Sequence, residues 1–264
     1  MDLDEYANEY LKFMNTVHKN GHSLNVSTIT LICDLNVETI CIQTFCENFE
    51  EPNITMKVCK PNTEVEVTKR GRVKKSFYNQ VTLNYKDISK KSIKIFSNGK
   101  LQITGLTSYY ECEVLTNYVI SILRRTLTNE DISVTRRYVG MINSNFSVKT
   151  NLDLQKLNKI LNKKVNVMSI YNPESYPAIN MKYTQSNGTT ISIFIFGTGN
   201  IVITGGKTLA HMRASYDFIY EEILRNHSNV CKKTTYIPKE NKVESYIEGY
   251  PIRQYMSCVT KKNL

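Results

Sequence analysis

The chain contains the same short segment twice, and this internal repeat restricts the fold more than any other feature of the sequence. Residues 93–105 read IKIFSNGKLQITG, and residues 193–205 read IFIFGTGNIVITG. At an offset of 100 residues the two copies share Ile, Ile, Phe, Gly, Ile, Thr and Gly, in that order. A repeat of this kind predicts one supersecondary unit that the chain uses twice.

Each copy predicts a β-hairpin, because an alternating strand runs into a glycine-containing turn and a second alternating strand leads out of it. Successive side chains of a strand point to opposite faces of a sheet. One face therefore carries the isoleucines Ile93, Ile95 and Ile103, and the other carries Phe96, Gln102 and Thr104.

Shared patterns also flank the two hairpins. Apolar residues at helical spacing follow them over residues 108–125, with Val114 among the apolar positions, and over residues 208–225. Residues 35–40 and 152–157, which precede the hairpins, each predict the start of a short helix. Two such units predict an α+β fold in which one antiparallel sheet carries helices on one face.

The other face of this sheet is then uncovered, and its side chains are unusual for a solvated surface. A broad exposed face of aromatic, aliphatic and hydroxyl side chains marks a binding surface. Burial of some of the rings by strand twist or by the ends of the chain is the alternative interpretation. The residues concerned are Tyr78, Phe96, Thr104, Tyr176, Phe196, Val202 and Thr204.

The charge of the chain favours a polyanionic partner. Its 34 lysines and arginines exceed its 24 aspartates and glutamates, and the net charge of +10 suits nucleic acid, an acidic protein or a membrane surface. The acidic opening residues do not resemble a secretory signal, and no apolar stretch reaches the length of a membrane span. Seven cysteines without a Cys-x-x-Cys pair indicate a reducing, intracellular compartment.

Sequence motifs for catalysis and for cofactor binding are missing. The four histidines lack metal-ligand spacing, and neither a phosphate-binding loop nor a Gly-x-Ser-x-Gly motif occurs. We therefore expect no enzymatic activity, no metal ion, no cofactor and no small-molecule substrate.

Both hairpins resemble those of the TATA-binding protein family, which read approximately I-F-x-S-G-K-x-V-x-T-G-A-K. Residues 26–40 align with the first strand and helix of that family, and residues 171–177, YNPESYP, resemble its Y-E-P-E-L-F-P segment. The resemblance implies a saddle, in which two pseudo-symmetric repeats form one curved antiparallel sheet with helices on the convex face. It divides the chain into an N-terminal helical extension (1–22), a first repeat (23–126) with a basic insertion at about 60–76, a second repeat (127–228) and a C-terminal extension (229–264).

The resemblance implies a transcription initiation factor that binds and bends A·T-rich, TATA-like promoter DNA through the minor groove and recruits the transcription machinery. TATA-binding proteins are themselves a standard example of proteins that wedge apolar side chains between base steps. The wedge positions of the family correspond to Phe96 and Phe196 in the hairpins, and to Tyr78 and Tyr176 on the preceding strands.

Other positions of the family correspond to contacts with the floor of the groove. Apolar and small hydroxyl side chains suit A·T pairs, which lack the guanine amino group. The family also places one asparagine per repeat at the pseudo-dyad, where the alignment gives Leu24 and Met141 but Asn25 and Asn143 lie nearby. The remaining floor candidates are Val26, Thr104, Val202 and Thr204, with Gln102 in place of a valine.

Basic residues beside this face are expected to contact phosphates, which makes binding salt-dependent. The basic run at residues 69–75 is either a solvated loop or an additional phosphate contact. The candidate contacts are Lys94, Lys100 and Lys182, and Arg70 and Arg72 within that run.

The resemblance also implies partners. Glu174 lies in the segment that receives a transcription factor IIB-like protein, and RNA polymerase would join such a complex. The nucleus fits this role, as does a cytoplasmic viral factory, and the Asn-, Ile- and Lys-rich composition favours an AT-rich genome such as that of a large DNA virus or a protist. Two alternatives are an assembly subunit of the same fold and a single-stranded nucleic-acid or RNA binder without TATA specificity.

Overall fold

A computed structural model describes residues 1–17, 24–52, 54–58, 79–86 and 90–232. These residues lie in one compact unit, Met1–Lys232. Several residues named above lie outside the described residues, namely Tyr78, Arg70 and Arg72 with the rest of the basic insertion, and the C-terminal extension from residue 233.

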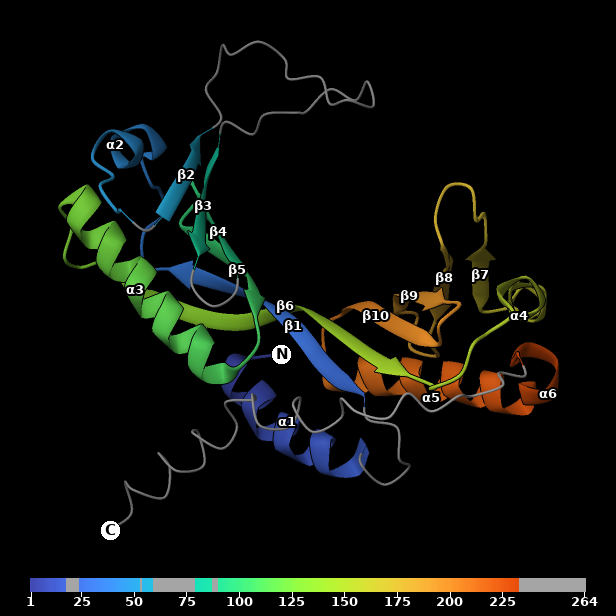
Figure 1. Ribbon diagram of the computed structural model, residues 1–264. Coiled ribbons are helices and arrows are strands. Elements are labelled where there is room, and N and C mark those ends of the chain that lie inside the picture. Colours follow the sequence, from blue (N-terminus) through green and yellow to red (C-terminus); the bar gives the residue numbers. More distant parts are fainter. Residues whose placement is uncertain (18–23, 53, 59–78, 87–89, 233–264) are drawn as a thin grey trace, which may run out of the picture. The chain divides into compact units, whose positions relative to one another are not determined.

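Ten strands form a single sheet in the order β2-β3-β4-β5-β1-β6-β10-β9-β8-β7, and all of its neighbouring strands are antiparallel (Figure 1). The order is symmetric about the β1–β6 pair, as expected for two copies of one unit. This confirms the predicted α+β fold with one large antiparallel sheet. The strands are β1 (Asn25–Leu35), β2 (Ile54–Val58), β3 (Gln80–Lys86), β4 (Lys90–Phe96), β5 (Lys100–Leu106), β6 (Val134–Ser147), β7 (Val167–Ile170), β8 (Ala178–Thr184), β9 (Thr190–Phe196) and β10 (Asn200–Gly206).

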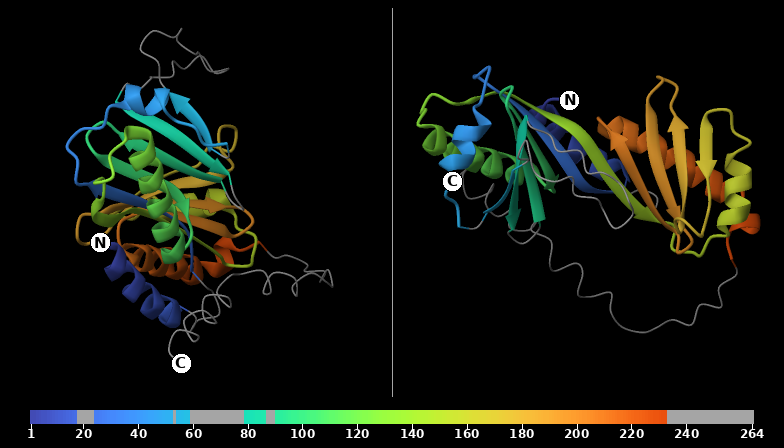
Figure 2. Two further views of the ribbon diagram at one scale, coloured as in Figure 1. Left: turned by 90° about the vertical axis from the view of Figure 1, so that its left-hand side faces the viewer. Right: turned by 90° about the horizontal axis from the view of Figure 1, so that it is seen from above.

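The two long helices follow the hairpins, as predicted. Figures 1 and 2 show α3 beside the strands of the first repeat and α5 beside those of the second. Both begin with a hydroxyl cap: the side chains of Ser108 and Thr208 accept hydrogen bonds from the backbone N–H groups of Glu111 and His211. The helices are α1 (Leu3–Val17), α2 (Ile42–Glu47), α3 (Tyr109–Leu127), α4 (Leu154–Leu161), α5 (Leu209–Arg225) and α6 (His227–Val230).

The first short helix begins later in the chain than the sequence predicts. Residues 36–41 are not helical, and α2 begins only at Ile42. The reason is that the backbone N–H groups of Leu35 and Ile40 donate to the carbonyls of Gly99 and Ser97 in the β4–β5 turn. These bonds hold the segment against the hairpin instead of within a helix.

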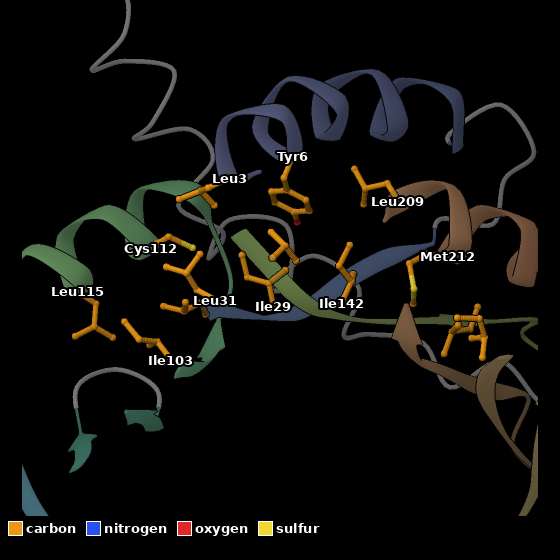
Figure 3. Packing of buried hydrophobic residues seen from close by; sticks show 14 of the residues in the cluster. Leu3, Tyr6, Ile29, Leu31, Ile103, Cys112, Leu115, Ile142, Leu209 and Met212 are labelled. Atoms are coloured by element: carbon orange, nitrogen blue, oxygen red, sulfur yellow. The ribbon is translucent and has the colours of Figure 1, made fainter. Parts of the chain in front are cut away.

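Burial along β4 and β5 confirms the predicted separation of the two sheet faces. Ile93, Ile95 and Ile103 are fully buried on the helix-bearing face, which belongs to the hydrophobic core (Figure 3). Phe96 and Gln102 are half-buried on the opposite face, called the open face below.

One apolar position of α3 differs from the expectation. Val114 is 48% exposed, whereas Cys112, Leu115 and Val119 carry the buried stripe of the helix. Val114 directly precedes Leu115, so it is rotated about 100° away from that stripe.

Helix α1 packs on the helix-bearing face and touches both β6 and α5. Its side chains Leu3 and Tyr6 are buried, and Figure 3 shows Leu3 toward Cys112 of α3 and Tyr6 above Ile29 of β1. The N–H of Val139 donates to the carbonyl of Met1 (3.0 Å), so the chain pairs with β6 just before α1 begins.

Two turn glycines occupy matching places in the repeats. Gly99 has φ +71° and Gly199 has φ +82°. A Cβ atom at Gly99 would lie 2.0 Å from the carbonyl oxygen of Val37, and one at Gly199 would lie 2.2 Å from that of Thr150. Both turns therefore require glycine for conformation and for close approach of the backbone.

Candidate nucleic-acid interface

The open face is built from rows of side chains that oppose each other across neighbouring strands. Matching rows of the two repeats differ in chemistry, because one contains a lysine and a glutamine where the other contains a phenylalanine and a valine. In the first repeat the row is Thr82, Lys94, Gln102, Ile32 and Tyr138; in the second it is Asn180, Phe194, Val202 and Asn145.

Three aromatic rings cluster at the outer end of the second repeat. The ring centroid of Tyr176 lies 6.0 Å from that of Phe194 and 6.2 Å from that of Phe196. Tyr176 is 45% exposed, and its N–H donates to the carbonyl of Asn172 in the turn that precedes β8. The cluster thus places two of the predicted wedge residues side by side, together with one residue that was not predicted.

The additional residue, Phe194, could have been found from the sequence. It precedes Phe196 by two positions and therefore lies on the same strand face. Comparison of the two copies draws attention to identical residues, however, and the counterpart of Phe194 at the 100-residue offset is Lys94.

The corresponding end of the first repeat carries Phe96. This residue ends β4 opposite Gln80, and the following N–H of Ser97 donates to the carbonyl of Asn79 (2.9 Å). The other predicted wedge of this repeat, Tyr78, lies just outside the described residues.

The centre of the sheet shows which positions of the two repeats correspond. Ile29 of β1 opposes Ile142 of β6, and on either side Thr28 opposes Asn143 and Thr30 opposes Met141. Positions that follow or precede the central Ile29–Ile142 pair by the same number of residues correspond in the two repeats. Thr28 therefore corresponds to Met141, and Thr30 corresponds to Asn143.

Asn143 is held by two hydroxyl groups on the open face. Its Nδ2 donates to Oγ1 of Thr28 (3.0 Å), and its Oδ1 accepts from Oγ1 of Thr204 (2.5 Å). Both bonds fix the orientation of the amide and leave one Nδ2 hydrogen for another acceptor. In the first repeat Thr104 instead donates to the carbonyl of Ser92 (3.3 Å).

The other predicted residues near the centre are placed differently from one another. Leu24 is fully buried, whereas Asn25 is exposed and opposes Asn145. Val26 opposes the buried Ser144 and packs against the hydrophobic core.

The predicted lysines have distinct surroundings. Lys100 donates from Nζ to Oδ1 of Asp34 (2.5 Å), and this hydrogen bond raises the pKa of the lysine. Lys182 donates to Oγ of Ser192 (2.5 Å) across β8 and β9. Lys94 is half-buried on the open face.

An arginine that the sequence did not single out also lies on this face. Arg136 is exposed opposite Asp34, with its guanidinium carbon 5.0 Å from the centroid of the Tyr138 ring. It adds a second cation close to Lys100.

Glu174 is exposed in the turn before Tyr176, and its N–H donates to Oδ1 of Asn172 (3.2 Å). Within the described ranges no group of His, Cys, Asp and Glu could hold a metal ion. Within the same ranges no helix is long and apolar enough to cross a membrane.

The model of the family "Transcription factor TFIID (or TATA-binding protein, TBP)" matches residues 139–226. A TATA-box-binding protein-like protein of Acanthamoeba polyphaga mimivirus is 30% identical over 288 aligned residues, which cover 94% of this chain and 76% of that protein. The solved structure of Methanococcus jannaschii TBP is similar in fold, with a TM-score of 0.50, 18% identity and coverage of 76% of this chain and 98% of its own.

Proposed function

The chain belongs to the TATA-binding protein family of DNA-binding transcription factors, and on this premise we propose that its open face binds and bends A·T-rich promoter DNA in the minor groove. Members of this family are DNA-binding factors and not enzymes. The fold supports the proposal, because the helices of the described residues lie along one side of the ten-stranded sheet.

The aromatic cluster of the second repeat is the observation that carries this proposal. Rings inserted between base steps unstack them and kink the duplex, and the energy of unstacking is offset by a wider contact surface. Tyr176 and Phe196 lie at the end of the sheet with their rings 6.2 Å apart, close enough to enter one base step as a pair. The ring of Phe194 packs against that of Tyr176 on the side of the pair that faces the centre of the open face.

The centre of the open face suits A·T pairs. Thr204, Val202 and the amide of Asn143 form a floor of small hydroxyl, aliphatic and amide groups. In the minor groove, A·T pairs present only the acceptors N3 and O2, and they lack the guanine amino group that would collide with an aliphatic side chain. The free Nδ2 hydrogen of Asn143 matches such an acceptor.

The two repeats would read their half-sites by different means. Phe194 and Val202 offer apolar contacts in the second repeat, whereas Lys94 and Gln102 offer hydrogen bonds in the first. We expect strong discrimination against G·C pairs under the second repeat and weaker discrimination under the first. Such a difference would give the bound protein a direction along the promoter.

Recruitment of further factors is the second part of the proposal. Glu174 projects from an exposed turn beside the wedge end of the second repeat, so a protein bound there would also lie close to the DNA. We propose that this turn receives a transcription factor IIB-like protein, through which RNA polymerase joins the complex.

Binding and bending of labelled duplexes, read by energy transfer between the duplex ends at two salt concentrations, tests the central proposal. We expect bending on A·T-rich duplexes, and Phe196→Ala should weaken binding about tenfold by removing a stacked ring worth 1–3 kcal/mol. Leu224→Ala is the matched control, because Leu224 is an exposed apolar residue of α5.

The same titrations separate the alternatives. Equal affinity for G·C-rich duplexes, or binding without a change in energy transfer, would contradict the wedge mechanism. Tighter binding to single strands than to duplexes would instead favour the single-stranded nucleic-acid binder, because exposed rings also stack on unpaired bases.

A further inference from the structure

Two oppositely charged side chains pair with each other on the open face of the first repeat. Asp34 of β1 opposes Lys100 of β5, and Nζ of the lysine donates to Oδ1 of the carboxylate (2.5 Å). Both side chains lie on the open face, because Ile32 and Gln102, two positions away on the same strands, belong to its first-repeat row. A carboxylate on a face that binds DNA needs an explanation, since it repels the phosphates.

The second repeat has uncharged residues at the corresponding place. Asp34 corresponds to Ser147, since each follows the central isoleucine of its repeat by five residues. Lys100 corresponds to Asn200 at the 100-residue offset, and Asn200 opposes Ser147 across β10 and β6. The fold therefore does not require an ion pair here. While the ion pair is intact, both repeats present no net charge at this place.

The surroundings of Lys100 do not favour a phosphate. Glu38 is exposed and lines the same hollow as Asp34 and Lys100, which has a volume of about 290 Å³. The two carboxylates outnumber the one ammonium group of this hollow. Arg136 opposes Asp34 from β6, and with its guanidinium the four charges sum to zero. A phosphate that approaches Lys100 thus meets no net positive charge, although the chain as a whole carries a net charge of +10.

The carboxylate of Asp34 cannot move far from the lysine. A single CH₂ group joins it to β1, a strand that is paired on both sides, and its side chain is 27% exposed against 47% for that of Lys100. The hydrogen bond to Asp34 raises the pKa of Lys100, so the ammonium group stays charged. A phosphate could take the lysine only by coming close to a carboxylate that remains in place, and the repulsion between these two anions opposes the exchange.

We propose that Asp34 is a positioning residue that holds Lys100 away from the DNA phosphates and so lowers the affinity of the first repeat for duplex DNA. This proposal rests on the proposed binding of duplexes by the open face. Lys100, which the sequence predicts as a phosphate contact, then contributes none in the native chain. Because phosphate contacts carry no sequence information, the effect is the same on A·T-rich and G·C-rich duplexes, and base preference is left to the other residues of the face.

Duplex affinity of the full chain, measured as a function of salt, tests the proposal. Each neutralised phosphate adds about 0.9 to the slope of log K against log[salt], so Asp34→Asn should steepen the slope by about 0.9 as it releases Lys100. The gain in affinity at about 50 mM salt should then be about 3.5 times the gain at about 200 mM. Asp34→Ser copies the second repeat and should act in the same way, whereas Asp34→Glu should keep the native slope. A gain in affinity cannot result from misfolding.

A double variant separates masking of the lysine from a general change of charge. Asp34→Asn with Lys100→Met has the native net charge and should return to the native slope, because neither protein offers this lysine to a phosphate. The matched control is Asp217→Asn on α5, which removes a carboxylate from another ion pair, that with Arg213 (2.8 Å), on the helix-bearing side of the sheet. It changes the net charge as Asp34→Asn does and should leave the slope unchanged.

Three results would overturn this proposal and leave the proposed promoter binding intact. One is an equal slope for the native chain and Asp34→Asn. Another is a double variant whose slope is about 0.9 shallower than the native slope, because Lys100 would then contact a phosphate in the native chain. The third is the same gain from Asp217→Asn, which would reduce the effect to net charge. A native chain and variants that all bind no duplex would instead overturn both proposals.

Discussion

The hairpins β4–β5 and β9–β10 agree on one face and differ on the other. Their buried faces share Ile93 with Ile193, Ile95 with Ile195 and Ile103 with Ile203. On the open face, Lys94 and Gln102 oppose each other in one hairpin and Phe194 and Val202 in the other. Packing under the helices therefore fixes the shared fold, while the open face is free to differ in chemistry.

One difference lies within the core itself. Lys91 is only 3% exposed, and its Nζ contacts the carbonyl of Gly105 and the carboxylate of Glu111, both at 2.6 Å. In the second repeat the matching residues are Ile191, which is fully buried, and His211. The same place is thus filled by an ion pair in one repeat and by an aliphatic side chain in the other.

The largest expected effect comes from breaking what the repeats share. Gly99→Ala and Gly199→Ala should each destabilise the protein by about 3 kcal/mol or more, because both force a positive φ on alanine and a collision with a backbone carbonyl. Gly205→Ala is the control: it has φ +94° but open space at the Cβ position, and should cost about 1 kcal/mol. Urea unfolding measures the free energy of unfolding of all three variants. Similar losses in all three would show that the close backbone carbonyl adds nothing to the effect of the positive φ.

The buried ion pair should have the next largest effect. Lys91→Ala removes the cation from a half-buried carboxylate and leaves the Gly105 carbonyl unpaired, for a loss of about 2–3 kcal/mol. The double change Lys91→Ile with Glu111→His copies the second repeat and should regain most of that stability. Thermal unfolding of the native chain, of Lys91→Ala and of the double variant measures these differences in stability. A double variant no more stable than Lys91→Ala would show that the residues of the two repeats are not interchangeable at this place.

Exchange of the open-face pairs tests whether the chemistry of each row sets its base preference. Phe194→Lys with Val202→Gln should lower discrimination against G·C pairs in the second half-site about tenfold, or about 1.4 kcal/mol. Lys94→Phe with Gln102→Val should raise the discrimination against G·C pairs in the first half-site. Competition between duplexes altered in one half-site at a time measures both, and equal changes in both half-sites would contradict the assignment.

The smallest expected effect is a dependence on pH. Burial raises the pKa of Glu111, but hydrogen bonds from Lys91 and Thr107 outweigh it and leave the pKa below the ordinary value of 4.5. A lowered pKa stabilises the fold above pH 4.5, and that stability is lost as the pH falls through the lower folded value. We expect less than about 1 kcal/mol, since the group is partly solvated. Chemical unfolding at pH 3 and pH 6 should show a larger loss in the native chain than in the Lys91→Ile, Glu111→His variant, because the lowered pKa of Asp153 contributes to both.

Local patterns were sufficient to predict much of this structure. The alternation of apolar and polar residues predicted which side chains of β4 and β5 lie on each face of the sheet. The hydroxyl residues Ser108 and Thr208 lie at the starts of the two long helices. These features depend on residues close together in the chain, so the sequence carries them directly.

Features that depend on strand register could not be predicted. The bond of Asn143 to Thr28 depends on the pairing of β1 with β6, whose register shifts beside Thr28 and beside Thr30, and the bond to Thr204 depends on the pairing of β6 with β10. The position of Arg136 opposite Asp34 also depends on the pairing of β1 with β6. A shift of one residue reverses the face of every following side chain, and no local pattern specifies where it occurs.

The position of α1 has a consequence for the order of folding during synthesis. Its apolar side chains are buried near β6 and α5, which leave the ribosome much later. At 5–20 residues per second, roughly 10 to 40 s separate α1 from α5. A helix of 15 residues is marginal alone in water, so Leu3 and Tyr6 have no lasting cover in that interval. The nascent chain therefore has to keep this segment from aggregating until translation of the second repeat is complete.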